Sequence, residues 1–116
     1  MASLEKKIFT VSDERRTLPN TTMETVRFGD RTVTRITYQP GWRWTNDIKP
    51  TAGSDLCHVN HFVYVLSGRT HVVMADGREM DIVPGDVATI PAGHDAWVVG
   101  DEPCVLIDFG GAVRPE

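Results

Sequence analysis

The sequence has few of the features that mark secreted or membrane proteins. It contains only two cysteines, Cys57 and Cys104, too few for the disulfide framework of a small secreted domain. No apolar run approaches the roughly 20 residues that a membrane-spanning helix needs. Residues 1–7 lack the apolar core of a signal peptide. We therefore expect a cytoplasmic protein that makes no membrane contact.

Basic clusters and phosphate-binding loops are absent as well. Lys and Arg are scattered along a chain whose formal net charge is -4, whereas a nucleic-acid surface usually needs a basic patch. No Gly-rich loop is present to hold the phosphates of a nucleotide. The sequence thus argues against a nucleic-acid partner and against an organic cofactor.

Short β-type runs fill most of the 116 residues, a length that suits one domain. No stretch keeps a helical period over ten or more residues. The runs are rich in Val, Ile, Thr and aromatic side chains, as strands are. They span residues 22–28, 31–38, 42–49, 57–66, 70–74, 78–82, 87–90, 95–99 and 104–109. We assign residues 1–20 to an N-terminal arm, with a short strand at 8–11, and residues 21–116 to a single domain.

The breaks between these runs have turn chemistry. Gly-Asp at 29–30 and Asp-Gly at 76–77 suit tight hairpins. Pro-Gly at 40–41 and at 84–85 cannot lie inside a central strand. Short strands at this spacing predict a sandwich or a closed barrel.

Two stretches resemble the paired motifs of the cupin superfamily. The first motif runs Gly, five residues, His-x-His, a short gap, Glu, six residues, Gly. Here Gly41 is followed after five residues by Asp47 and then Lys49, and after a longer gap His61 stands six residues before Gly68. The turn sequences 64–68, 84–86 and 90–93 strengthen the resemblance, and the run 94–103 is similar to small, uncharacterised single-domain members.

The second motif runs Gly, five residues, Pro-x-Gly, two residues, His. Gly85, Pro91 and Gly93 match it, but Ala96 stands where the histidine belongs and His94 lies two residues earlier. The resemblance spans about half the chain, from 41 to 97. It implies an all-β fold, a small antiparallel jelly-roll barrel of the cupin type.

The resemblance also implies a metal site, from which this chain departs. The family places two histidines, a glutamate and a third histidine around one metal. The matching positions hold Asp47, Lys49, His61 and Ala96, and none keeps the family's residue. His61 and Asp47 are still residue types that bind metals, whereas Lys49 and Ala96 are not ordinary ligands.

Side-chain alternation suggests a different ligand set. If 57–65 is one strand with position 61 inside the barrel, Cys57 also points inward and His58 points away. By the same rule His94 shares the inward face of position 96. We therefore expect an inward group of Cys57, His61 and His94, with Asp47 within reach. Thiolate, imidazole and carboxylate suit Zn²⁺, and Fe²⁺ is the other candidate.

A structural explanation of the same residues stays open. A buried cysteine packs as a small hydrophobe, a histidine inside a barrel can simply hydrogen-bond, and Lys49 can neutralise Asp47. Trp42 and Trp44 share a face of the expected strand at 42–49. They either wall a ligand pocket, with Lys49 supplying charge, or form a dimer contact, or pack in the core.

Three functions remain compatible with the sequence. The first is a metal-dependent enzyme of the oxygenase, isomerase or lyase type, acting on a small organic molecule in the barrel. The alternative is a metal-free module that binds or senses a small molecule. The third role is assembly as a homodimer, through a sheet face or the N-terminal arm. The same barrel hosts many activities, so the fold does not choose among them.

Overall fold

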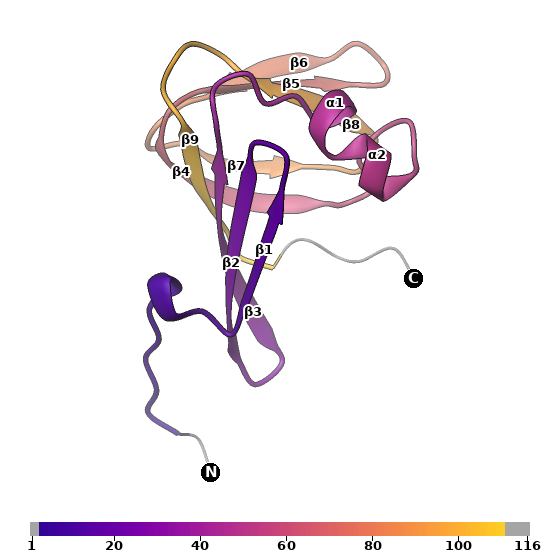
Figure 1. Ribbon diagram of the computed structural model, residues 1–116. Helices are drawn as coiled ribbons and strands as arrows, with labels where there is room; N and C mark the ends of the chain where they lie inside the picture. The colour runs from indigo at the N-terminus through magenta and orange to yellow at the C-terminus, as the bar shows by residue number, and fades with distance from the viewer. Residues whose placement is uncertain (1–2, 111–116) are drawn as a thin grey trace.

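Residues 3–110 are described by the computed structural model, and they form two antiparallel β-sheets packed into a barrel (Figure 1). The larger sheet has the strand order β1-β2-β3-β9-β4-β7 and the smaller one β6-β5-β8. The strands are β1 Glu14–Leu18, β2 Thr21–Phe28, β3 Arg31–Tyr38, β4 His61–Ser67, β5 Thr70–Met74, β6 Glu79–Ile82, β7 Val87–Ile90, β8 His94–Val98 and β9 Cys104–Asp108. The predicted all-β, antiparallel jelly-roll barrel is confirmed.

The core lies between the two sheets and follows the alternation of side chains along each strand. In β4, Val63 and Val65 are 1% and 0% exposed, while the neighbouring Phe62 and Tyr64 face outward. The smaller sheet contributes Val72 and other apolar side chains to the same core. This arrangement leaves the inward end of β4, at His61, next to the barrel's interior.

The predicted strand at 42–49 is wrong, because this segment folds into two short helices, α1 (Trp44–Asp47) and α2 (Lys49–Ala52). Asp95, far away in the sequence, accepts hydrogen bonds from the backbone N–H and the hydroxyl of Thr45 at the start of α1. Local signals for α2 were present: a proline in its first turn and Gly53 as its left-handed C-cap. Figure 1 shows both helices beside β8 at one side of the barrel.

The N-terminal segment also differs from expectation. The short strand predicted at 8–11 is instead a 3₁₀ turn, η1 (Phe9–Val11). The predicted arm ends in β1, an edge strand that pairs with β2 along its whole length. A cross-strand row of charges supports this pairing, because Glu24 of β2 bonds both Arg15 and Arg35. Glu14–Leu18, which was assigned to the arm, is therefore a strand of the larger sheet.

Gly68, the last glycine of the first motif, is required by a close backbone approach. Its φ is +77°, and a Cβ placed there would lie 2.3 Å from the carbonyl oxygen of Pro103. Only glycine fits where the end of β4 passes the segment that leads into β9. Among residues 3–110, no helix is long and apolar enough to cross a membrane.

Candidate metal site and adjoining pocket

Cys57, His61 and His94 come together at one end of the barrel's interior. Their ligand atoms all lie within 4.8 Å of one another. His61 begins β4 and His94 begins β8, while Cys57 lies in the segment that precedes β4. An isolated β-bridge between Cys57 and His94 holds that segment in place, through Cys57 N–H to His94 O at 2.9 Å. The three residues predicted by alternation are thus adjacent, although the strand starts later than expected.

In each histidine the Nδ1 atom makes a hydrogen bond outside the three-residue group, which leaves the Nε2 atom for contacts within it. The Nδ1 of His61 lies 2.7 Å from a carboxylate oxygen of Asp108, and that of His94 donates to the carbonyl of Pro91 at 2.6 Å. The Nε2 of His61 then lies 3.8 Å from the sulfur of Cys57. Fixing a histidine through its second nitrogen is the usual way of orienting a metal ligand.

The surroundings shift the pKa values of Cys57 and His61. Burial would raise the pKa of the Cys57 thiol, but hydrogen bonds from His61, His94 and the Val59 backbone N–H lower it to about 6. Burial would lower the pKa of His61, but its hydrogen bonds to Asp108 and Cys57 raise it to about 9. The arrangement therefore favours a thiolate, the form of cysteine that binds metals.

This donor set fits a divalent metal ion. A thiolate and two imidazoles, once their Nε2 atoms are released from hydrogen bonding to the sulfur, match the ligand types of three-residue zinc sites that keep one position open. Bond lengths of about 2.3 Å to sulfur and 2.0 Å to nitrogen place tetrahedral donors about 3.5 Å apart. The Cys57–His61 separation of 3.8 Å is already close to that value. The residues present therefore suit the ion without a change of fold.

A pocket of about 440 Å³ opens beside the group. Cys57 and His61 line it, and His61 also borders a second cavity of about 40 Å³, deeper in the barrel, that His94 lines. The larger pocket lies between strands β1 to β3 and the two helices, and its volume suits a small organic molecule. Its other lining residues include Leu18, Met23, Thr25, Thr34, Ile36, Tyr38, Trp42, Trp44, Ile48 and Val59.

Trp42 and Trp44 are 3% and 4% exposed, and they belong to the core as well as lining this pocket. Burial of both side chains agrees with two of the three alternatives, the pocket wall and core packing, and does not choose between them. The Trp42 ring stacks on Tyr38 with centroids 3.9 Å apart. Burial, reinforced by the nearby Cys57 and Asp108, raises the pKa of Tyr38 well above its usual value. Its hydroxyl therefore stays protonated and remains a hydrogen-bond donor at the pocket wall.

Asp47 and Lys49 do not join the group. The Asp47 carboxylate accepts a hydrogen bond from the Arg43 backbone N–H at 3.0 Å, within the first turn of α1. Lys49 pairs with Asp55 at 3.3 Å and does not line the pocket. Both were placed by the spacing of the first family motif, but the segment that was predicted as a strand forms the helices α1 and α2.

Asp108 is the functional residue that the sequence analysis missed. It is 3% exposed and orients His61 from the end of β9. In β9 the inward positions are Cys104, Leu106 and Asp108, so Asp108 is a lone carboxylate on an otherwise apolar face. Such a residue needs a partner when buried, and this pattern was the signal that could have identified it.

Comparisons with solved structures show the fold. The chain superposes on the polyketide cyclase RemF from Streptomyces resistomycificus with a TM-score of 0.64 and 19% identity, over 91% of this chain and 78% of that one. It matches an oxalate decarboxylase from Lactobacillus farciminis, determined as a formate complex, with a TM-score of 0.62 and 16% identity, over 93% of this chain but 33% of that one.

A third neighbour is a sugar phosphate isomerase of the cupin superfamily from Silicibacter pomeroyi. It has a TM-score of 0.57 and 24% identity, over 89% of this chain and 73% of that one. No curated protein matches the sequence. The model of the cupin domain family matches residues 47–110, more than half of the chain. The chain therefore belongs to the cupin domain family.

Proposed function

We propose that this protein binds one divalent metal ion, Zn²⁺ or Fe²⁺, through Cys57, His61 and His94, and acts as an enzyme on a small organic molecule in the adjoining pocket. The observation that carries the proposal is the convergence of three ligand atoms within 4.8 Å, two of them from Cys57 and His61, which line a pocket of about 440 Å³. A bound ion would supply Lewis acidity toward an oxygen of that molecule.

The remaining residues have roles of their own in this proposal. Asp108 holds the imidazole of His61 in the orientation that presents Nε2. Tyr38 keeps a protonated hydroxyl at the pocket wall, and Trp42 and Trp44 exclude water from one side. Three of the solved neighbours are described as a cyclase, a decarboxylase and an isomerase, so the fold is compatible with an enzymatic role, but it does not select a reaction.

A metal-free binding or sensing module is the second candidate, and one observation favours it. The Cys57 sulfur already accepts hydrogen bonds from His61 and His94, so the group is satisfied without an ion. The pocket would then hold its ligand without any contact to a metal ion. This candidate differs from the first in two measurable properties, the metal content of the protein and the absence of catalysis.

Metal analysis of the purified protein, followed by titration with Zn²⁺ or Fe²⁺, tests the proposal. We expect about one ion per chain, and at a free metal concentration about 100 times Kd a stabilisation of about 2.7 kcal/mol. Cys57→Ser and His61→Ala should each remove most of both effects. His71→Ala is the matched control, because His71 pairs with Asp81 and Glu79 away from this group and should leave binding unchanged.

Two outcomes would overturn the metal proposal in favour of the metal-free module. One is a wild-type protein that takes up well below one ion per chain from either metal. The other is binding that persists equally in Cys57→Ser and His61→Ala.

A further inference from the structure

Most of the charged side chains that line the larger pocket are paired with a group of opposite charge, but one is not. Glu14 is bonded to Arg27, and the buried Asp108 is bonded to His61. Arg16 also lines the pocket, from the edge strand β1, yet it forms no salt bridge with any residue between 3 and 110. Within that range its guanidinium is a positive charge on the pocket wall without an acidic partner.

The strand register places an apolar surface directly beside this charge. Arg16 in β1 is opposite Met23 in β2, and Met23 is opposite Ile36 in β3. Neighbouring strands lie about 4.8 Å apart, so side chains in one such row form a continuous surface. All three residues line the pocket. The row is therefore cationic at its outer end and apolar toward the interior.

The helices complete the apolar part of the pocket. Trp44 of α1 and Ile48, at the junction with α2, line the same space as Met23 and Ile36. Trp44 is 4% exposed, so its ring is fixed by packing. Lys49, the residue expected from the sequence to supply charge, turns away to Asp55. Arg16 is thus the one lysine or arginine among residues 3–110 that lines this pocket.

We infer that the ligand of this pocket is a small organic carboxylate with a flat apolar body. Its carboxylate pairs with Arg16 at the pocket mouth, and its body packs on Met23, Ile36 and Trp44. A guanidinium recognises a carboxylate through two parallel N–H···O bonds, which gives orientation as well as attraction. The inference names the class of ligand that the proposed function would use. It rests on that function only for the reaction, because the contact between Arg16 and the carboxylate does not involve Cys57, His61 or His94.

Two matched probes test the inference, 2-naphthoate and its neutral isostere 2-naphthamide. Isothermal titration calorimetry measures the affinity of each probe. The metal-free protein is used so that the carboxylate of the probe cannot bind directly to a metal ion. We expect the naphthoate to bind about five- to tenfold more tightly than the amide, the range for a partly exposed charge-assisted pair. Raising the salt concentration should weaken the naphthoate alone.

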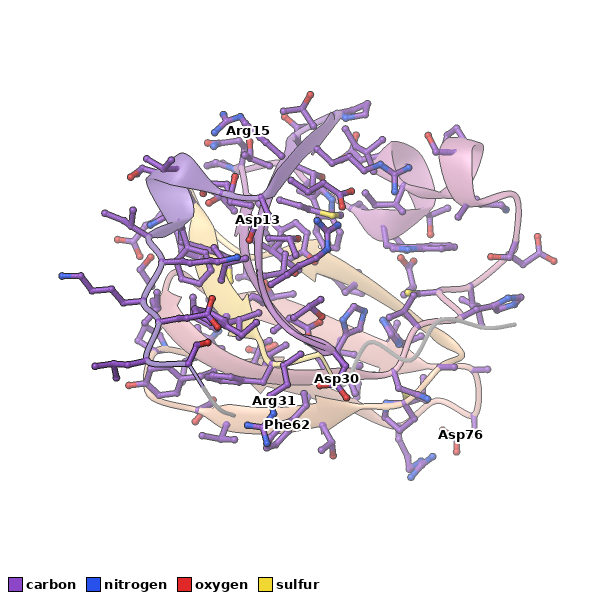
Figure 2. The ribbon with its side chains drawn as sticks, turned by 90° about the horizontal axis from the view of Figure 1, so that it is seen from below. Asp13, Arg15, Asp30, Arg31, Phe62 and Asp76 are labelled. Atoms are coloured by element: carbon purple, nitrogen blue, oxygen red, sulfur yellow. The ribbon has the colours of Figure 1, made fainter. Side chains whose placement is uncertain are left out.

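Arg16→Gln should abolish the preference for naphthoate and leave naphthamide binding unchanged. Arg15→Gln is the matched control, since Arg15 is on the same strand, labelled in Figure 2, but pairs with Glu24 and does not line the pocket. Equal affinity for the two probes in the wild type, or a preference that survives Arg16→Gln, would overturn the inference. So would a failure of both probes to bind. None of these results bears on metal content, which tests the proposed function separately.

Discussion

The two histidines of the candidate metal site differ in the group that orients them. His61 is paired with the buried carboxylate of Asp108, whereas His94 donates to the neutral carbonyl of Pro91. A carboxylate partner raises the basicity of an imidazole and makes it a stronger ligand than a carbonyl partner does. In the proposed site Asp108 would therefore raise metal affinity without contacting the metal itself.

Asp108→Asn should lower the affinity for Zn²⁺ by about 10- to 100-fold, because an amide orients the imidazole without adding negative charge. Competition with a chromophoric chelator measures the change. Asp81→Asn is a suitable control, since Asp81 also bonds a histidine Nδ1, that of His71, but on the smaller sheet. An Asp108→Asn protein that binds Zn²⁺ within twofold of the wild type would contradict this positioning role.

The segment that carries α1 and α2 is held by contacts from outside itself. Asp95 of β8 accepts hydrogen bonds from Thr45 and forms a salt bridge with Arg43 at 3.1 Å. Arg43 also lies over the Trp97 ring, 4.7 Å from its centroid. The helices are four residues each, too short to form on their own. Their position, and with it one wall of the pocket, therefore depends on Asp95.

Replacing Asp95 by alanine should lower the free energy of unfolding by about 1–3 kcal/mol at pH 7, because the partly buried donors of Thr45 and the buried N–H of Ala96 lose their acceptor. Burial opposes ionisation of Asp95, but bonds from Thr45, the Ala96 N–H and Arg43 hold its pKa below 3.8. A depressed folded-state pKa means that this stabilisation is present above about pH 4 and is lost as the pH falls through the folded value.

Urea denaturation at pH 7 and at pH 3 measures this difference, which should shrink at the lower pH. Asp55→Ala serves as the control, because the Asp55 side chain is 98% exposed in the same region and should change stability by less than about 0.5 kcal/mol. A loss in Asp95→Ala that stays constant across this range would show that the carboxylate's charge is not what holds α1.

The same contacts explain what the sequence could and could not predict. Strands with clear alternation and turn residues, such as 31–38 and 70–74, have the predicted bounds. Residues 42–49 have a strand-like composition, but the distant Asp95 decides their structure, and propensity is overridden by such tertiary contacts. Alternation brought His61 and His94 together correctly, whereas the orienting role of Asp108 depends on which strands are neighbours.

The outer face of the larger sheet carries an apolar surface that residues 3–110 leave uncovered. Phe62, Tyr64 and Leu66 of β4 are 44%, 38% and 47% exposed, and Val87 of β7 is 64% exposed. Phe109 extends the surface, with its ring centroid 6.2 Å from that of Phe62. Contiguous apolar patches of this kind commonly mark interfaces, and a two-fold axis lets one surface pair with itself. We propose that this face forms a homodimer.

Phe62→Glu should convert that dimer to a monomer, because two opposed carboxylates would be buried at the centre of the interface. Sedimentation velocity at about 10 and 100 µM would measure the change. Met80→Glu is a matched control: Met80 is also 44% exposed but lies on β6 of the smaller sheet, so this variant should remain dimeric. Phe62, labelled in Figure 2, is already solvent-accessible, so the monomeric fold should survive its replacement.

A wild-type protein that sediments as a monomer at the higher concentration would refute the dimer, and equal dissociation by both variants would place the interface elsewhere.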